Sequence, residues 1–176
     1  TSFSRRGGRL PDRLARAMAE HGDRFVLDPP RAAGATTVAP GWRLDPAEAF
    51  GRVAPLVVEI GAGNGGQAVH AAATYPATNY LAVEVWVPGI AQAVVAAARE
   101  RTENLRVLPA DAAASLGRVL PAGSVAEVWT FFPDPWRKAR HHKRRLVQPG
   151  FAADVARILA PGGVWRLATD WPDYAE

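Results

Sequence analysis

The segment VVEIGAGNGGQ, from Val57 to Gln67, joins an apolar run to four closely spaced glycines and then to an alanine-rich stretch. Short apolar runs bounded by glycine are typical of buried β-strands. Glycines allow the backbone to turn tightly and to approach a ligand closely, here at the N-terminus of a helix. The segment therefore predicts a strand over Leu56–Gly61, a ligand-binding turn, and a helix over Gly65–Tyr75.

The same alternation of short β-prone runs and helical stretches continues along the rest of the chain. Further strands are expected over Asn79–Val85, Leu105–Asp111, Val125–Phe132 and Val164–Thr169, and helices over Pro88–Arg101, Leu116–Val119 and Phe151–Ala160. This pattern predicts an α/β fold with a doubly wound, mainly parallel sheet. Residues 1–50 are expected to form a basic N-terminal arm and a peripheral segment, with a short helix in Leu10–Glu20 and a loop over Asp28–Pro40.

Composition limits the class of protein. The 176 residues are 48% hydrophobic and 22% charged, as in a globular domain, and no apolar run is long enough to span a bilayer. Because the chain has no cysteine, disulfides and thiolate metal sites are excluded. We expect a cytoplasmic protein.

Basic charge is concentrated in two segments. Residues 1–18 contain five arginines, and residues 137–145 contain six lysines and arginines, whereas residues 19–136 carry a net negative charge. One interpretation is a surface that binds the phosphate backbone of a nucleic acid. The other is a solvated surface loop and an unstructured tail.

Acidic residues occur at successive strand ends, where open α/β sheets bind ligands. Glu59 precedes the first glycine by two residues and would repel a pyrophosphate, so it favours the ammonium group of S-adenosylmethionine over a dinucleotide. Glu84 suits ribose hydroxyls in either type of cofactor. Asp111 is interpreted either as an acceptor for adenine or as a helix cap. A solvated Glu59 and an exposed Glu84 remain alternatives.

Two later strand ends pair an aspartate with a tryptophan. Asp134 lies between two prolines and precedes Trp136, while Asp170 precedes Trp171. Two carboxylates with flanking aromatic rings are able to hold a base, by accepting its N–H groups and stacking on its face. Carboxylate acceptors match the ring N–H and amino group of guanine. The alternatives are a rigid turn with Trp136 as a lid, and a helix cap at Asp170.

Taken together, these motifs resemble the bacterial tRNA (guanine-N7-)-methyltransferase family, which has a class I S-adenosylmethionine-dependent fold. The similarity extends from SFSRR at Ser2–Arg6 to ATDWPDYAE at the end of the sequence. Its most specific parts are EIGAGNGG, NYLAVEV, FFPDPWRKARHHKRRLVQPGF and LATDW. The resemblance implies transfer of a methyl group from S-adenosylmethionine to N7 of a guanosine in the variable loop of tRNA.

The resemblance also assigns roles to individual residues. It implies cofactor binding by Glu59, Glu84, Asp111 and Asp134, beside the backbone of Gly61 and Gly63, a catalytic or substrate role for Asp134, substrate contacts by Lys138 and Asp170, and RNA contacts by Arg140, His141, His142, Lys143, Arg144 and Arg145. Because guanine N7 has a free lone pair, direct displacement needs no general base. The expected partner is tRNA, with no membrane and no metal, and the protein is expected to be a monomer or homodimer.

The sequence departs from the family pattern at its end. Class I methyltransferases usually add two strands beyond the fifth, so residues 51–176 are expected to be a cofactor-binding catalytic domain that lacks its last C-terminal strands. Two further hypotheses remain open: a methyltransferase for another nucleobase, and a non-catalytic S-adenosylmethionine- or RNA-binding module. A nicotinamide oxidoreductase is disfavoured because nothing resembles a hydride-transfer site.

Overall fold

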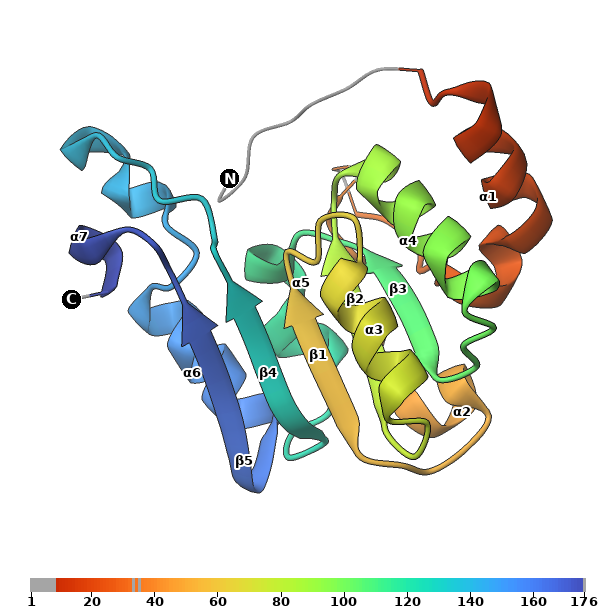
Figure 1. The fold of residues 1–176 in the computed structure, drawn as a ribbon. Coiled ribbons are helices and arrows are strands. Elements are labelled where there is room, and N and C mark those ends of the chain that lie inside the picture. The colour runs from red at the N-terminus through yellow and green to blue at the C-terminus, as the bar shows by residue number, and fades with distance from the viewer. Residues whose placement is uncertain (1–8, 33, 35, 176) are drawn as a thin grey trace.

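The computed structural model describes residues 9–32, 34 and 36–175. In this part of the chain, five strands form one parallel sheet in the order β3-β2-β1-β4-β5 (Figure 1). The strands are β1 (Leu56–Ile60), β2 (Asn79–Glu84), β3 (Leu105–Pro109), β4 (Val125–Phe131) and β5 (Leu159–Ala168). The predicted doubly wound parallel sheet is therefore confirmed. The SFSRR segment, with Arg5 and Arg6, lies outside the described residues.

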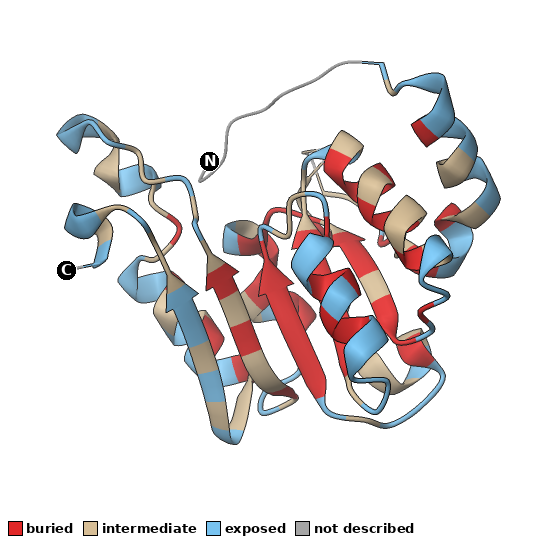
Figure 2. Cartoon of the chain, viewed as in Figure 1, coloured by how far each residue is buried: buried red, intermediate tan, exposed pale blue. Residues whose placement is uncertain are grey.

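The sheet separates two hydrophobic cores because helices cover both of its faces. The helices are α1 (Asp12–Phe25), α2 (Pro46–Phe50), α3 (Gly66–Thr74), α4 (Val87–Arg99), α5 (Ala112–Val119), α6 (Pro149–Ile158) and α7 (Pro172–Ala175). One core lies under α1, α3 and α4, and the other lies under α2, α5 and α6 (Figure 1). Strand β1 is buried along its whole length, as its mainly apolar sequence predicts, and the buried residues include Glu59 (Figure 2).

The order of the strands indicates where the sheet would bind a ligand. The chain moves outward from β1 through β2 to β3, and then returns to the other side of β1 to form β4 and β5. The order therefore reverses between β1 and β4. Because all strands are parallel, their carboxyl ends meet at one edge, and open α/β sheets bind ligands in the crevice at such a reversal.

The segment before β1 packs more closely than its sequence suggested. Helix α1 continues to Phe25, beyond the predicted end at Glu20, because Phe25 is fully buried against the core under α4. Helix α2 was not predicted; Asp45 caps it by accepting hydrogen bonds from the first turn. The predicted loop is anchored by a hydrogen bond from Asp111 N to Thr36 O, 2.7 Å.

The bounds of the last strand and the structure of the basic segment 137–145 also differ from expectation. Strand β5 begins at Leu159, five residues before the predicted start, because Leu159 already pairs with Val125. Its register then shifts, so that Val164 pairs with Glu127. The basic segment contains a 3-10 helix, η1 (Ala139–Arg144), which sequence periodicity did not indicate.

Candidate active site

A cavity of about 340 Å³ lies at the carboxyl ends of β1, β2, β3 and β4. Its volume falls within the usual range for small-molecule pockets. Four of the sequence-predicted cofactor residues line it, and they come from four different strand ends: Gly61, Glu84, Asp111 and Asp134. Glu59 and Gly63 lie outside its lining. The fold thus brings together residues that are up to 73 positions apart in the sequence.

The glycine turn is held open beside this cavity. Gly61 and Gly63 have φ angles of 72° and 58°, the left-handed region that side chains disfavour, and a Cβ atom at either position would meet open space. Behind the turn, Gly89 of α4 packs so closely that a Cβ would lie 2.2 Å from Gly63 O. Gly89, which sequence reasoning missed, therefore positions the turn.

Glu84 fixes the turn to the end of β2. Its Oε2 accepts a hydrogen bond from Gly63 N, 2.7 Å. Its Oε1 accepts hydrogen bonds from Val85 N and Trp86 N, at 2.6 and 2.9 Å. A carboxylate has about four lone-pair sites, so Glu84 retains acceptor capacity while it organises the backbone around the cavity.

Glu59 is buried next to the turn. Only 7% of the residue is exposed, and its Oε2 atom is buried without a hydrogen-bond partner. Burial raises the pKa of Glu59 from 4.5 to about 7, Ala68 N–H lowers it, and the nearby charge of Glu84 raises it further. An unsatisfied buried carboxylate is costly unless a donor or cation reaches it. Glu59 therefore has a buried carboxyl oxygen beside the cavity that is able to accept a hydrogen bond or to pair with a cation.

Asp111 and Asp134 contribute in different ways. Asp111 caps α5, because its Oδ1 accepts from Ala113 N at 3.1 Å, and it also lines the cavity, so the two alternatives for this residue are compatible. Asp134 follows β4, is exposed, and also lines the cavity. Lys138 and Asp170 are exposed and line neither this cavity nor the second one described below.

A second cavity, of about 910 Å³, adjoins the first. Its lining comes from the end of β5, from η1 and the residues that follow it, and from α7. Charged and polar groups are prominent in it, including Lys143, Arg145, Gln148, Thr169 and Asp173. Sequence reasoning did not identify Asp173 or Tyr174 of this cavity, because α7 is only four residues long and its place against η1 is a tertiary contact.

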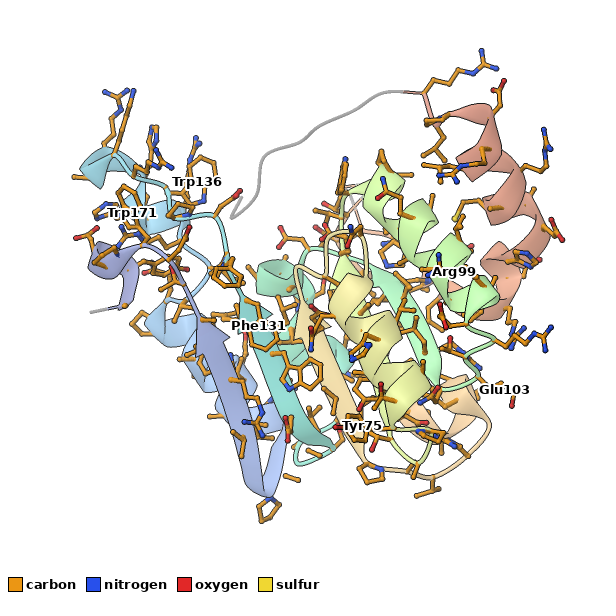
Figure 3. The ribbon with its side chains drawn as sticks, viewed as in Figure 1. Tyr75, Arg99, Glu103, Phe131, Trp136 and Trp171 are labelled. Atoms are coloured by element: carbon orange, nitrogen blue, oxygen red, sulfur yellow. The ribbon has the colours of Figure 1, made fainter. Side chains whose placement is uncertain are left out.

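Both sequence-predicted tryptophans are covered by arginines. The guanidinium of Arg144 lies 4.8 Å from the ring centroid of Trp136, and that of Arg137 lies 4.8 Å from the centroid of Trp171. Figure 3 shows both tryptophans at the corner formed by η1 and α7. In this arrangement the two rings stabilise the basic segment by cation–π contacts.

Arg145 differs from the other cations of the basic segment. Its side chain is only 9% exposed and forms an ion pair with Asp173. It also donates hydrogen bonds to Pro135 O and Asp173 O, at 3.0 and 2.8 Å, and lies over the ring of Tyr174. The Arg145 guanidinium holds the pKa of Asp173 below its usual value. Arg145 thus joins the Pro133–Arg145 segment to α7, whereas Arg140 is exposed.

Fold and cavity together have the features of the class I methyltransferase fold: a parallel sheet that reverses at β1, a glycine turn after β1 and a carboxylate at the end of β2. Among solved structures, the geranyl diphosphate C-methyltransferase from Streptomyces coelicolor A3(2) has this fold, with a TM-score of 0.52 and 18% identity. The match covers 72% of this chain and 43% of that one.

Sequence comparison identifies the family. Residues 53–176 match a family described as "Putative methyltransferase". The tRNA (guanine-N(7)-)-methyltransferase of Arthrobacter sp. (strain FB24) is 53% identical over 99% of this chain and 54% of its own length. The enzyme of the same name from Alkalilimnicola ehrlichii is 47% identical over 99% of this chain and 70% of its own length. The chain belongs to the tRNA (guanine-N(7)-)-methyltransferase family, as its motifs predicted.

The chain spans somewhat more than half the length of some curated relatives that it matches: 54% of the Arthrobacter protein and 58% of the one from Paenarthrobacter aurescens. Within the described residues, none of the helices has the length and apolar character needed to cross a membrane. The same residues contain no group of three or more histidines and carboxylates that could hold a metal ion.

Proposed function

We propose that the protein transfers a methyl group from S-adenosylmethionine to N7 of a guanosine in the variable loop of tRNA. The observation that carries the proposal is the arrangement of acids around the 340 Å³ cavity, in a chain that belongs to the tRNA (guanine-N(7)-)-methyltransferase family. The 910 Å³ cavity adjoins it and has cations in its wall, which suits a phosphate-bearing substrate.

The residues present fit S-adenosylmethionine. The unpartnered buried oxygen of Glu59 suits the ammonium of its amino-acid part, and the open space at Gly61 and Gly63 admits that part close to the backbone. Spare acceptor capacity on Glu84 suits the ribose hydroxyls, and Asp111 lies on the wall where an adenine amino group would be accepted. When bound, the cofactor supplies an electrophilic methyl group on a positively charged sulfur.

The protein's contribution is then alignment and electrostatics. In direct displacement the N7 lone pair would form the C–N bond as the C–S bond breaks, which would place positive charge on the guanine ring and would require no proton to be removed. We propose that Asp134, which lines the same cavity as Glu84, orients the guanine and offsets the charge that the ring acquires. Lys138 and Asp170 are proposed as further substrate contacts on the exposed rim.

Methyl transfer tests this function directly. We expect label from S-adenosylmethionine to appear in a tRNA transcript with guanosine in the variable loop and to be recovered as 7-methylguanosine. A transcript with adenosine at that position is expected to remain unlabelled, and Asp134→Asn is expected to reduce kcat by roughly 100-fold, the scale on which one charged group acts in a transition state. Cofactor binding without transfer to either transcript would instead favour the non-catalytic binding module.

The exposed cations of η1 are proposed to bind the RNA backbone, with Arg140 as the test case. Removing one phosphate contact reduces the slope of log affinity against log salt by about one unit. We therefore expect Arg140→Gln to weaken tRNA binding and to flatten the salt dependence by about this amount. Arg99→Gln is the matched control: its side chain is 76% exposed but lies on α4, away from Trp136 and η1 (Figure 3), so the slope should be unchanged. Equal slopes for wild type and Arg140→Gln would place the RNA surface elsewhere.

A further inference from the structure

Phe132 lies at the boundary between the two cavities. Of the residues that the structure describes, Phe132 and Pro133 alone line both the 340 Å³ cavity and the 910 Å³ cavity. Phe132 is nevertheless 65% exposed, although it directly follows β4, whose residues are buried or half-buried. A large aromatic ring is therefore presented to the space where cofactor and substrate would meet.

The backbone holds Phe132 in an unfavourable conformation. Its φ angle is 50°, in the left-handed region that residues with a Cβ seldom adopt. Its N–H donates to Ala168 O at 2.8 Å, which extends the pairing of β4 with β5, and Pro133 restricts the following backbone. Because the ring is largely exposed, its burial contributes little free energy to offset this strain. Strained, well-anchored residues of this kind are concentrated at ligand-binding sites.

The tryptophans of the two Asp–Trp pairs and Tyr174 of the second cavity are engaged in cation–π contacts. Arginine guanidinium groups lie within 4.8 Å of the ring centroids of Trp136, Trp171 and Tyr174. Phe132 takes part in none of the ring–ring or cation–π contacts found in residues 9–32, 34 and 36–175. Its face is thus available to an incoming planar group.

The second cavity has the chemistry to hold a nucleotide beside that ring. Lys143 is a cation for a phosphate, and Gln148 and Thr169 offer hydrogen-bond donors and acceptors for the edge of a base. The cavity volume is at the upper end of the range for single small ligands. A base in this cavity with one face on Phe132 would have its edge at the boundary with the first cavity.

We propose that Phe132 is the stacking platform for a purine base extruded from the RNA, and that it aligns this base at the boundary of the two cavities. The inference rests on the proposed function in taking the base to be the target guanine. It assigns to Phe132 the aromatic role that the sequence favoured for Trp136 and Trp171.

The decisive test is a binding cycle that needs no turnover. Affinity is measured for a tRNA with guanosine at the target position and for the same tRNA with an abasic site there, using wild type and Phe132→Ala. Because stacking of one base on an aromatic ring is worth on the order of tenfold or more in affinity, the preference for the guanosine tRNA should fall by about that factor in Phe132→Ala. Phe132→Tyr should restore it. An unchanged preference would overturn the proposal.

Three controls separate stacking from a structural role and from the proposed function. The Tm of Phe132→Ala should match that of wild type, because the ring is largely exposed; a marked loss of Tm would show that the residue is structural. Because Phe132 also lines the cofactor cavity, both proteins are compared at saturating S-adenosylmethionine. Tyr75→Ala removes another exposed ring, which is 61% exposed, follows α3 and lines neither cavity, and it should leave the base preference unchanged. Methyl transfer by wild type is measured separately. Its absence would contradict the proposed function, whereas the binding cycle alone tests whether the base stacks on Phe132.

Discussion

Replacing Glu59 by glutamine is expected to stabilise the fold at pH 8 and to weaken the binding of S-adenosylmethionine. The carboxyl group of Glu59 is buried, and burial raises its pKa from 4.5 to about 7. A pKa shift of this size means that ionised Glu59 lowers the free energy of unfolding of wild type by roughly 3 kcal/mol, and a neutral side chain at this position avoids that loss. Glutamine has nearly the same shape and carries no charge.

The direction of the pH dependence follows from the raised pKa. A carboxyl group with a raised folded-state pKa contributes stability below about pH 4.5, and this contribution is lost as the pH rises through about 7. The difference between Glu59→Gln and wild type should therefore be small near pH 4.5, grow between pH 4.5 and 7, and reach its plateau above pH 7. Urea unfolding at a series of pH values, followed by tryptophan fluorescence, measures it.

Glu127 provides a control of opposite sign. Its pKa is lowered, chiefly because Arg166 donates a hydrogen bond to it at 2.7 Å. Glu127→Gln should thus lose stability above the ordinary pKa of glutamate, whereas Glu59→Gln gains it. If the two variants showed the same pH dependence, the conclusion that Glu59 is buried without a hydrogen-bond partner for Oε2 would be contradicted.

The gain in stability should coincide with a loss of cofactor affinity. Glutamine at position 59 cannot supply the negative charge that we propose for the ammonium of S-adenosylmethionine. In wild type, binding should also release a proton near pH 7, because a cation favours ionised Glu59. Calorimetry in two buffers of different ionisation enthalpy detects this release, which should be absent in Glu59→Gln.

Gly65→Ala is expected to cause a large loss of stability. Gly65 has a φ angle of 74°, and a Cβ there would lie 2.4 Å from Ala93 Cβ and 3.1 Å from Ala93 Cα. Helices α3 and α4 would have to separate. Left-handed strain of about 1–2 kcal/mol and overpacking of about 1–3 kcal/mol together predict a cost of roughly 2–5 kcal/mol.

Gly123→Ala separates these two causes. Gly123 has a similar φ angle, 66°, but a Cβ there would have no neighbour within 4 Å. Gly123→Ala should therefore show only the backbone strain. Denaturant unfolding of both variants gives the difference between them, which is the steric contribution at the α3–α4 contact. Equal losses would mean that the helices move apart at little cost.

The sequence by itself determined the strand–helix alternation, the glycine turn and the strand-end acids. These are local properties: apolar runs predict strands, glycines permit left-handed turns, and a parallel sheet brings its carboxyl strand ends to one edge. Gly61, Glu84, Asp111 and Asp134 therefore meet around one cavity as an α/β fold requires.

Only the tertiary structure decided which of several similar side chains are exposed and able to contact a ligand. Arg145 and Arg140 belong to one basic run, yet only the packing of α7 pairs Arg145 with Asp173. The tryptophans and Phe132 are all aromatic, yet arginines cover Trp136 and Trp171, while Phe132 is exposed between the two cavities. Such differences depend on contacts between segments far apart in the chain, and no local pattern of residue types encodes which of several similar side chains those contacts will cover.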